Sequence, residues 1–177
     1  MEEKIKRPFL KPALIYGTIL GVVGILLSLI FYFLDLTFKS WTQWLSLAVG
    51  IVVLTYCLIA YRKEYMGGFA SYGRLFLMAL AIGFTASVIG AVFTYILYAF
   101  IDPELLEKSR IVAQEAILNN TRIPESMHDD VLERIDKRMT LPRMIRSSLV
   151  MGTILYMVIG LIAAAFVKKE ETPVDAV

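Results

Sequence analysis

Cysteine and histidine each occur once in this 177-residue chain, which restricts the chemistry available to it. The single cysteine, Cys57, excludes an intramolecular disulfide, and the single histidine, His128, excludes the His-Glu-x-x-His pattern of zinc hydrolases. The pair Gly67-Gly68 lacks the Lys-Ser or Lys-Thr that completes a phosphate-binding loop. One histidine with scattered carboxylates (His128, Asp129, Glu133) is typical of a solvated helix face. We therefore predict no catalytic, cofactor-binding or metal-binding residue.

Charged residues are also scarce, at 19% of the chain against 58% apolar residues. They are absent from four long runs, at residues 13–34, 41–61, 75–101 and 147–167. Each run reaches the length of about 20 residues that a helix needs to cross a bilayer core. A soluble helix of this length would show a polar face, but residues 17–34 contain only Thr18, Ser28 and Tyr32 as mildly polar side chains. The sequence therefore predicts an integral membrane protein.

The predicted fold is an all-α, antiparallel four-helix transmembrane bundle with an extramembrane amphipathic helical hairpin between spans three and four. We expect the first run to be a retained anchor, because it is longer than the ~7–15 residues of a signal peptide and no small-x-small cleavage site follows it. The expected parts are a basic N-terminal tail (1–12), three spans (13–101), the hairpin (102–142), the fourth span (143–167) and a C-terminal tail (168–177).

The distribution of basic residues predicts the orientation of the chain. They are densest before the first span, between spans two and three, and after span four: Lys4, Lys6, Arg7, Lys11, Arg62, Lys63, Arg74, Lys168 and Lys169. Because basic residues favour the cytoplasmic side, both termini are predicted to be cytoplasmic and the hairpin extracytoplasmic.

The hairpin is the only sizeable hydrophilic part of the chain. Asp102-Pro103-Glu104 is typical of a helix start, and we expect that helix to end near Leu118. A second helix is expected to end near Thr140, with Leu141-Pro142 closing it before the last span. Its apolar stripe comprises Met127, Val131, Leu132, Ile135 and Met139. This stripe could pack within the hairpin, on the membrane surface or on a partner, and the sequence leaves these alternatives open.

Small residues recur at spacings of three and four within the spans, as close helix packing in a membrane requires. The predicted helix-packing residues are Gly17, Gly21, Gly24, Gly50, Gly83, Gly90 and Gly160. Packing within the chain is the preferred interpretation, and a face for a homo-oligomer is the alternative.

Several short motifs give the chain a family resemblance. They are Tyr16-Gly17, Tyr61-Arg62, Gly67-Gly68-Phe69-x-Ser71-Tyr72-Gly73 (the inner-loop motif), Phe100-Ile101-Asp102-Pro103, and the segment from Ala163 to Lys169. In this order they resemble the Bacteroidota membrane family catalogued as domain of unknown function 4199. The resemblance implies four spans and a bacterial inner membrane, but no known activity. It also implies a polyprenyl-phosphate glycosyltransferase as a partner, because genes for such enzymes lie near those of family members.

These features favour a non-enzymatic accessory, scaffold or anchoring subunit for another envelope protein. The alternative is a small transporter or flippase component that handles a lipid-linked or neutral substrate. Ion-coupled carriers usually require an acidic, basic or histidine side chain inside a span, and none of the four long apolar runs contains one. Membrane lipid is an expected partner, and nucleic acid is not.

Overall fold

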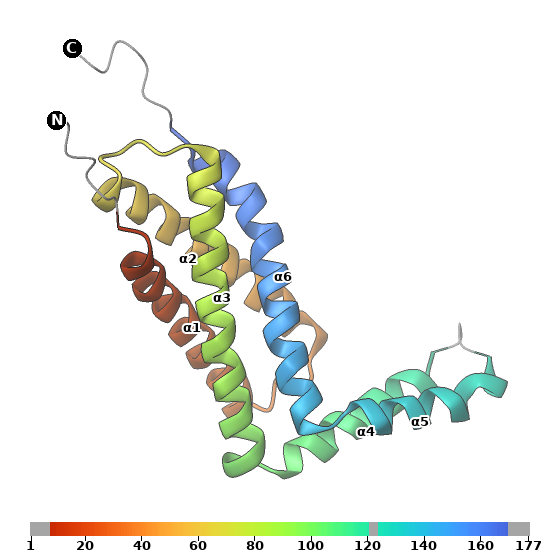
Figure 1. Cartoon of the computed structure of the whole chain (residues 1–177). Helices are drawn as coiled ribbons and strands as arrows, with labels where there is room; N and C mark the ends of the chain where they lie inside the picture. Colours follow the sequence, from red (N-terminus) through yellow and green to blue (C-terminus); the bar gives the residue numbers. More distant parts are fainter. Residues whose placement is uncertain (1–7, 121–123, 170–177) are drawn as a thin grey trace, which may run out of the picture.

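The computed structural model describes residues 8–120 and 124–169, and every regular element in these two ranges is helical. The elements are α1 (Leu10–Phe33), α2 (Ser40–Tyr65), α3 (Tyr72–Ile96), the π-helical segment η1 (Leu97–Ile101), α4 (Glu104–Leu118), the short 3₁₀ turn η2 (Glu125–Met127), α5 (His128–Arg138) and α6 (Leu141–Val167). In Figure 1 the long helices α1, α2, α3 and α6 lie side by side, and α4 and α5 extend away from them.

The four long helices are long and apolar enough to cross a membrane. They are α1, α2, α3 with its continuation η1, and α6. Large apolar side chains such as Ile30, Trp44 and Phe84 are exposed on their outer surfaces. Because lipid is as apolar as these side chains, their exposure carries no penalty in a bilayer, whereas it would in water. These properties indicate a membrane protein.

Helix α3 lies between α1 and α6 and makes the most extensive contacts with both. By contrast, α1 contacts α2 less extensively than α3, although only residues 34–39 separate α1 from α2. The close contact between α1 and α3 depends on two glycines: Gly17 and Gly21 of α1 leave room for the side chains of Thr85 and Ile89 on α3.

The densest packing lies at the end of the molecule where α1 begins and α6 ends, which we call the basal end (Figure 1). Its fully buried side chains are Leu54, Cys57, Leu58, Tyr61, Leu75, Met78, Ala79, Ile82 and Ala164. At the opposite end, the arm end, α4 and α5 leave sideways as an arm (residues 104–138; Figure 1).

The last long helix begins earlier than the sequence suggests. Leu141-Pro142 is the first turn of α6 and not the close of the preceding helix, since α5 ends at Arg138. A proline is tolerated there because the first N–H groups of a helix have no partner within it. Arg143 and Arg146 therefore lie in α6 itself, ahead of its apolar part.

Candidate functional site

The arm is a hairpin of two helices that pack against each other. Val131, Leu132, Ile135 and Met139 of the α5 stripe are half-buried, so much of the stripe packs within the hairpin. Another apolar set stays exposed on the arm and is called the arm face: Ile111, Val112, Leu118 and Met127. Leu118 and Met127 are 53% and 52% exposed. The arm therefore presents apolar surface beyond what its own packing uses.

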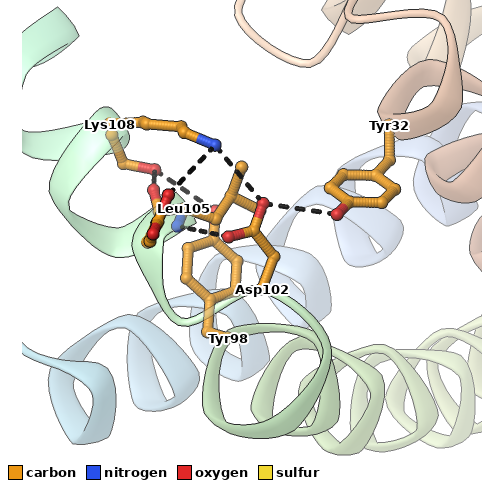
Figure 2. A network of polar contacts seen from close by, with 7 residues as sticks. Tyr32, Tyr98, Asp102, Leu105 and Lys108 are labelled. Atoms are coloured by element: carbon orange, nitrogen blue, oxygen red, sulfur yellow. Dashed lines mark hydrogen bonds and ion pairs between the residues drawn. The ribbon is translucent and has the colours of Figure 1, made fainter.

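Asp102 attaches the arm to the long helices (Figure 2). One carboxylate oxygen accepts a hydrogen bond from the backbone N–H of Leu105 (3.2 Å), which caps α4. The other oxygen accepts from the Tyr32 hydroxyl of α1 (3.3 Å) and lies 3.6 Å from the Lys108 ammonium. The Asp102 side chain is only 15% exposed, so these interactions are partly shielded from solvent. A single carboxylate thus joins the start of α4, where the arm begins, to the end of α1.

A second link holds the same corner. The hydroxyl groups of Tyr98 in η1 and Ser109 in α4 lie 3.4 Å apart. The N–H of Asp102 donates to the carbonyl of Leu97, five residues earlier (2.8 Å). This five-residue spacing is the hydrogen-bond pattern of the π-helical segment η1. Next to this corner is a groove of about 330 Å³, lined partly by Asp35, Asp102 and Lys108. The described residues that line this groove do not form a recognisable catalytic set.

Arg110 of α4 links the two arm helices. Its guanidinium donates to Glu107 (3.0 Å) and to the carbonyl of Met139 (3.2 Å), and lies 3.8 Å from Asp136. Gln114 also donates to Asp136 (2.9 Å). These contacts connect α4 with the end of α5, so they hold the two arm helices together near the root of the hairpin.

The inner-loop motif lies at the basal end, where it joins α2 to α3. Gly67 and Gly68 have φ angles of +66° and +91°, a region that favours glycine. Ser71 precedes α3 as its N-cap residue, and a Cβ at Gly73 would meet no atom within 4 Å. The Tyr72 hydroxyl donates to the carbonyl of Leu161 on α6 (3.3 Å). The motif therefore forms a tight turn that also contacts α6.

Residues from distant parts of the chain close this end. Ala70 and Lys169 exchange two backbone hydrogen bonds (2.8 and 3.1 Å), and the Lys169 ammonium lies 4.9 Å from the centre of the Phe69 ring. Arg62 of α2 donates to the carbonyl of Val167 at the end of α6 (2.6 Å). A cation at a helix C-terminus is favourable because the last carbonyls carry partial negative charge. Several segments that carry the family resemblance thus meet here.

The predicted helix-packing glycines fall into three groups. A Cβ placed on the first group would come very close to a neighbouring helix: 2.5 Å from Thr85 at Gly17, 3.0 Å from Ile89 at Gly21, 2.3 Å from Tyr156 at Gly83 and 2.7 Å from Ala79 at Gly160. At Gly50 the nearest atom would be Tyr156 at 3.7 Å, an ordinary contact. At Gly24 and Gly90 it would meet nothing within 4 Å.

Gly24 and Gly90 are open because they line a cleft of about 250 Å³ between α1, α3 and α6. The cleft lies toward the arm end, and its described lining contains hydroxyl groups but no acidic, basic or histidine side chain. Ser87 and Thr94 donate to the carbonyls of Gly83 and Gly90 one turn earlier on their own helix (2.8 and 2.9 Å). Their hydrogen-bonding needs are therefore met within α3.

Among residues 8–120 and 124–169, no group of three or more His, Cys, Asp and Glu side chains could hold a metal ion. Cys57 is fully buried in the basal core. The strongest candidate for a functional site is the arm with its attachment at Asp102, where apolar side chains remain exposed.

Comparisons with known proteins give one match. Neither the curated proteins nor the solved structures contain a match to this chain. The family described as "Protein of unknown function (DUF4199)" matches residues 15–169, nearly the whole length of the chain. The match covers α1 from Ile15 onward and the whole of α2, α3, the arm and α6, so the chain belongs to this family of proteins of unknown function.

Proposed function

We propose that this protein is a non-enzymatic accessory or anchoring subunit of a bacterial inner membrane, in the Bacteroidota, and that its arm binds another envelope protein. In this proposal the long helices form an antiparallel four-helix transmembrane bundle with both termini in the cytoplasm. A polyprenyl-phosphate glycosyltransferase is the partner that the family resemblance suggests.

The observation that carries this proposal is the exposed arm face on a rigidly attached hairpin. Arg110 holds α4 to α5, and Asp102 holds α4 to α1. A preorganised surface loses little conformational entropy when a partner binds. Exposed apolar side chains at Leu118 and Met127 supply the surface to be buried. The densely packed basal end supports an anchoring role, because its buried side chains come from all four long helices and hold them together.

The test is site-specific photo-crosslinking in cells of the native host. A photoreactive amino acid at Leu118 or Met127 should give the same discrete protein adduct, identified by mass spectrometry. The control position is Glu104, whose side chain is 85% exposed at the root of the arm, about 20 Å along α4 from Leu118. It should give no such adduct.

Two results would count against the proposal. One is lipid adducts alone at both arm positions under several growth conditions. The other is an equally strong protein adduct at Glu104, which would indicate random collision rather than a defined surface.

The cleft between α1, α3 and α6 favours one other function, a small carrier or flippase component for a lipid-linked or neutral substrate. Its hydroxyl-bearing lining suits an uncharged group. Reconstituted vesicles that move no polyprenyl-linked sugar would remove this alternative, whereas filling the cleft with Gly90→Leu should stop any movement that is seen.

A further inference from the structure

The junction between α5 and α6 carries a groove with three arginines. The groove has a volume of about 800 Å³ and is lined by Arg138, Arg143, Arg146, Ser147, Val150 and Met151. We propose that it binds an anionic phospholipid, with the lipid phosphate on the arginines and an acyl chain along Val150 and Met151. This site is independent of the partner proposed for the arm face.

Positive charge in the groove is not balanced by the protein. The lining contains no carboxylate. The nearest acidic residues in the sequence are Glu133 and Asp136, and they already pair with Lys137 and with Arg110. Within the described residues, Arg138 and Arg146 have no ion-pair or hydrogen-bond partner, whereas Arg143 donates to the carbonyl of Lys137. Guanidinium groups bind phosphate oxygens through paired, charge-assisted hydrogen bonds, so an anionic phosphate complements this groove.

The start of α6 strengthens the case for an anion. Helices α4 and α5 carry acidic residues in their first turns, but α6 has none there and no side-chain cap. Arg143 instead lies close to the partial positive charge of the helix N-terminus, an unfavourable arrangement on its own. A phosphate in the groove would interact favourably with both the guanidinium groups and the helix end.

The length of α6 places the groove at the depth of lipid headgroups. Its 27 residues span about 40 Å, roughly 10 Å more than a hydrocarbon core. Lys168 and Lys169 follow its far end, which fixes that end at the opposite membrane surface. The excess therefore falls on the first two turns, which hold Arg143 and Arg146. Val150 and Met151 follow Arg146 within about 8 Å along the axis. A charged site that passes directly into an apolar one matches a phospholipid, not a soluble anion.

The test is native mass spectrometry of the full-length protein in detergent, titrated with phosphatidylglycerol or with zwitterionic phosphatidylcholine. Phosphatidylglycerol should bind more tightly. The double variant Arg138→Gln/Arg146→Gln should weaken its binding roughly 25-fold, about fivefold per arginine. These two residues are chosen because their side chains make no hydrogen bond in the described structure, so folding should be retained. The matched control, Lys39→Gln/Arg134→Gln, removes the same charge from exposed positions outside the groove and should change binding less than threefold.

Three results would overturn the proposal. The double variant and its control could weaken binding equally, which would indicate a general charge effect. Phosphatidylcholine could bind as tightly as phosphatidylglycerol. A large excess of inorganic phosphate could displace the lipid, which would assign the groove to a soluble anion.

Discussion

At the scale of single residues, Asp102 shows how one side chain can decide the placement of an entire segment. Its carboxylate contacts three groups that come from α1 and from two positions of α4. The cap on Leu105 could be predicted from Asp102-Pro103-Glu104, because helix capping depends on residues adjacent in the sequence. The contact with Tyr32 could not, since the two residues are 70 positions apart and meet only in the folded chain.

We predict that Asp102→Ala loosens the arm while leaving the core intact. Losing the cap and the bond to Tyr32 should lower the free energy of local opening by about 1–2 kcal/mol. Amide hydrogen exchange in α4 should then accelerate roughly 5- to 30-fold, with little change at buried positions of α2 and α3. Glu104→Ala is the control, because Glu104 is exposed and lies 4.0 Å from Lys108. It should change exchange by less than about twofold. Equal acceleration in the arm and the basal core would contradict this role for Asp102.

At the scale of helices, the sequence defines the spans well because length and hydropathy are local properties. The structure places α1, α2, α3 and α6 over the four predicted runs, with ends that differ by several residues where polar side chains continue a helix beyond the bilayer core. Which helices pack against each other is harder to predict from the sequence. The spacing of small residues treats Gly83 and Gly90 alike, yet Gly83 faces Tyr156 of α6 and Gly90 faces a cleft. Which neighbour meets a given glycine depends on how the helices cross, and the spacing of small residues along one helix does not reveal that.

We predict opposite outcomes for the same substitution at these two glycines of α3. A Cβ at Gly83 would lie 2.3 Å from the Cβ of Tyr156, so Gly83→Ala must push α3 and α6 apart. The expected loss is about 1–3 kcal/mol in the free energy of unfolding. Gly90→Ala should be neutral or stabilising by up to about 1 kcal/mol, because alanine favours the helix and meets no neighbour. Unfolding by sodium dodecyl sulfate in mixed micelles, followed by circular dichroism, measures both. Equal destabilisation by the two variants would show that contact with Tyr156 is not what Gly83 permits.

At the scale of the whole molecule, the two ends differ in how densely they are packed. The basal end combines a dense core with Arg62, Arg74 and Lys169, each of which contacts a neighbouring segment or ring. The arm end combines an open cleft with a projecting hairpin. This difference suits a protein that is anchored at one membrane surface and binds at the other.

The orientation that follows can be measured by cysteine labelling in intact cells. We predict that Glu115→Cys, exposed on α4, reacts with a membrane-impermeant maleimide added from outside, and that Lys168→Cys reacts only after the inner membrane is opened. The basic residues at the basal end favour the cytoplasm, which places the arm outside. The unsubstituted chain is the control and should stay unlabelled, since its one cysteine, Cys57, is fully buried. The reverse labelling pattern would invert the topology and move the arm, its proposed partner and the arginine groove to the cytoplasmic side. Labelling of both positions from outside would mean that the long helices do not separate the two ends across a membrane.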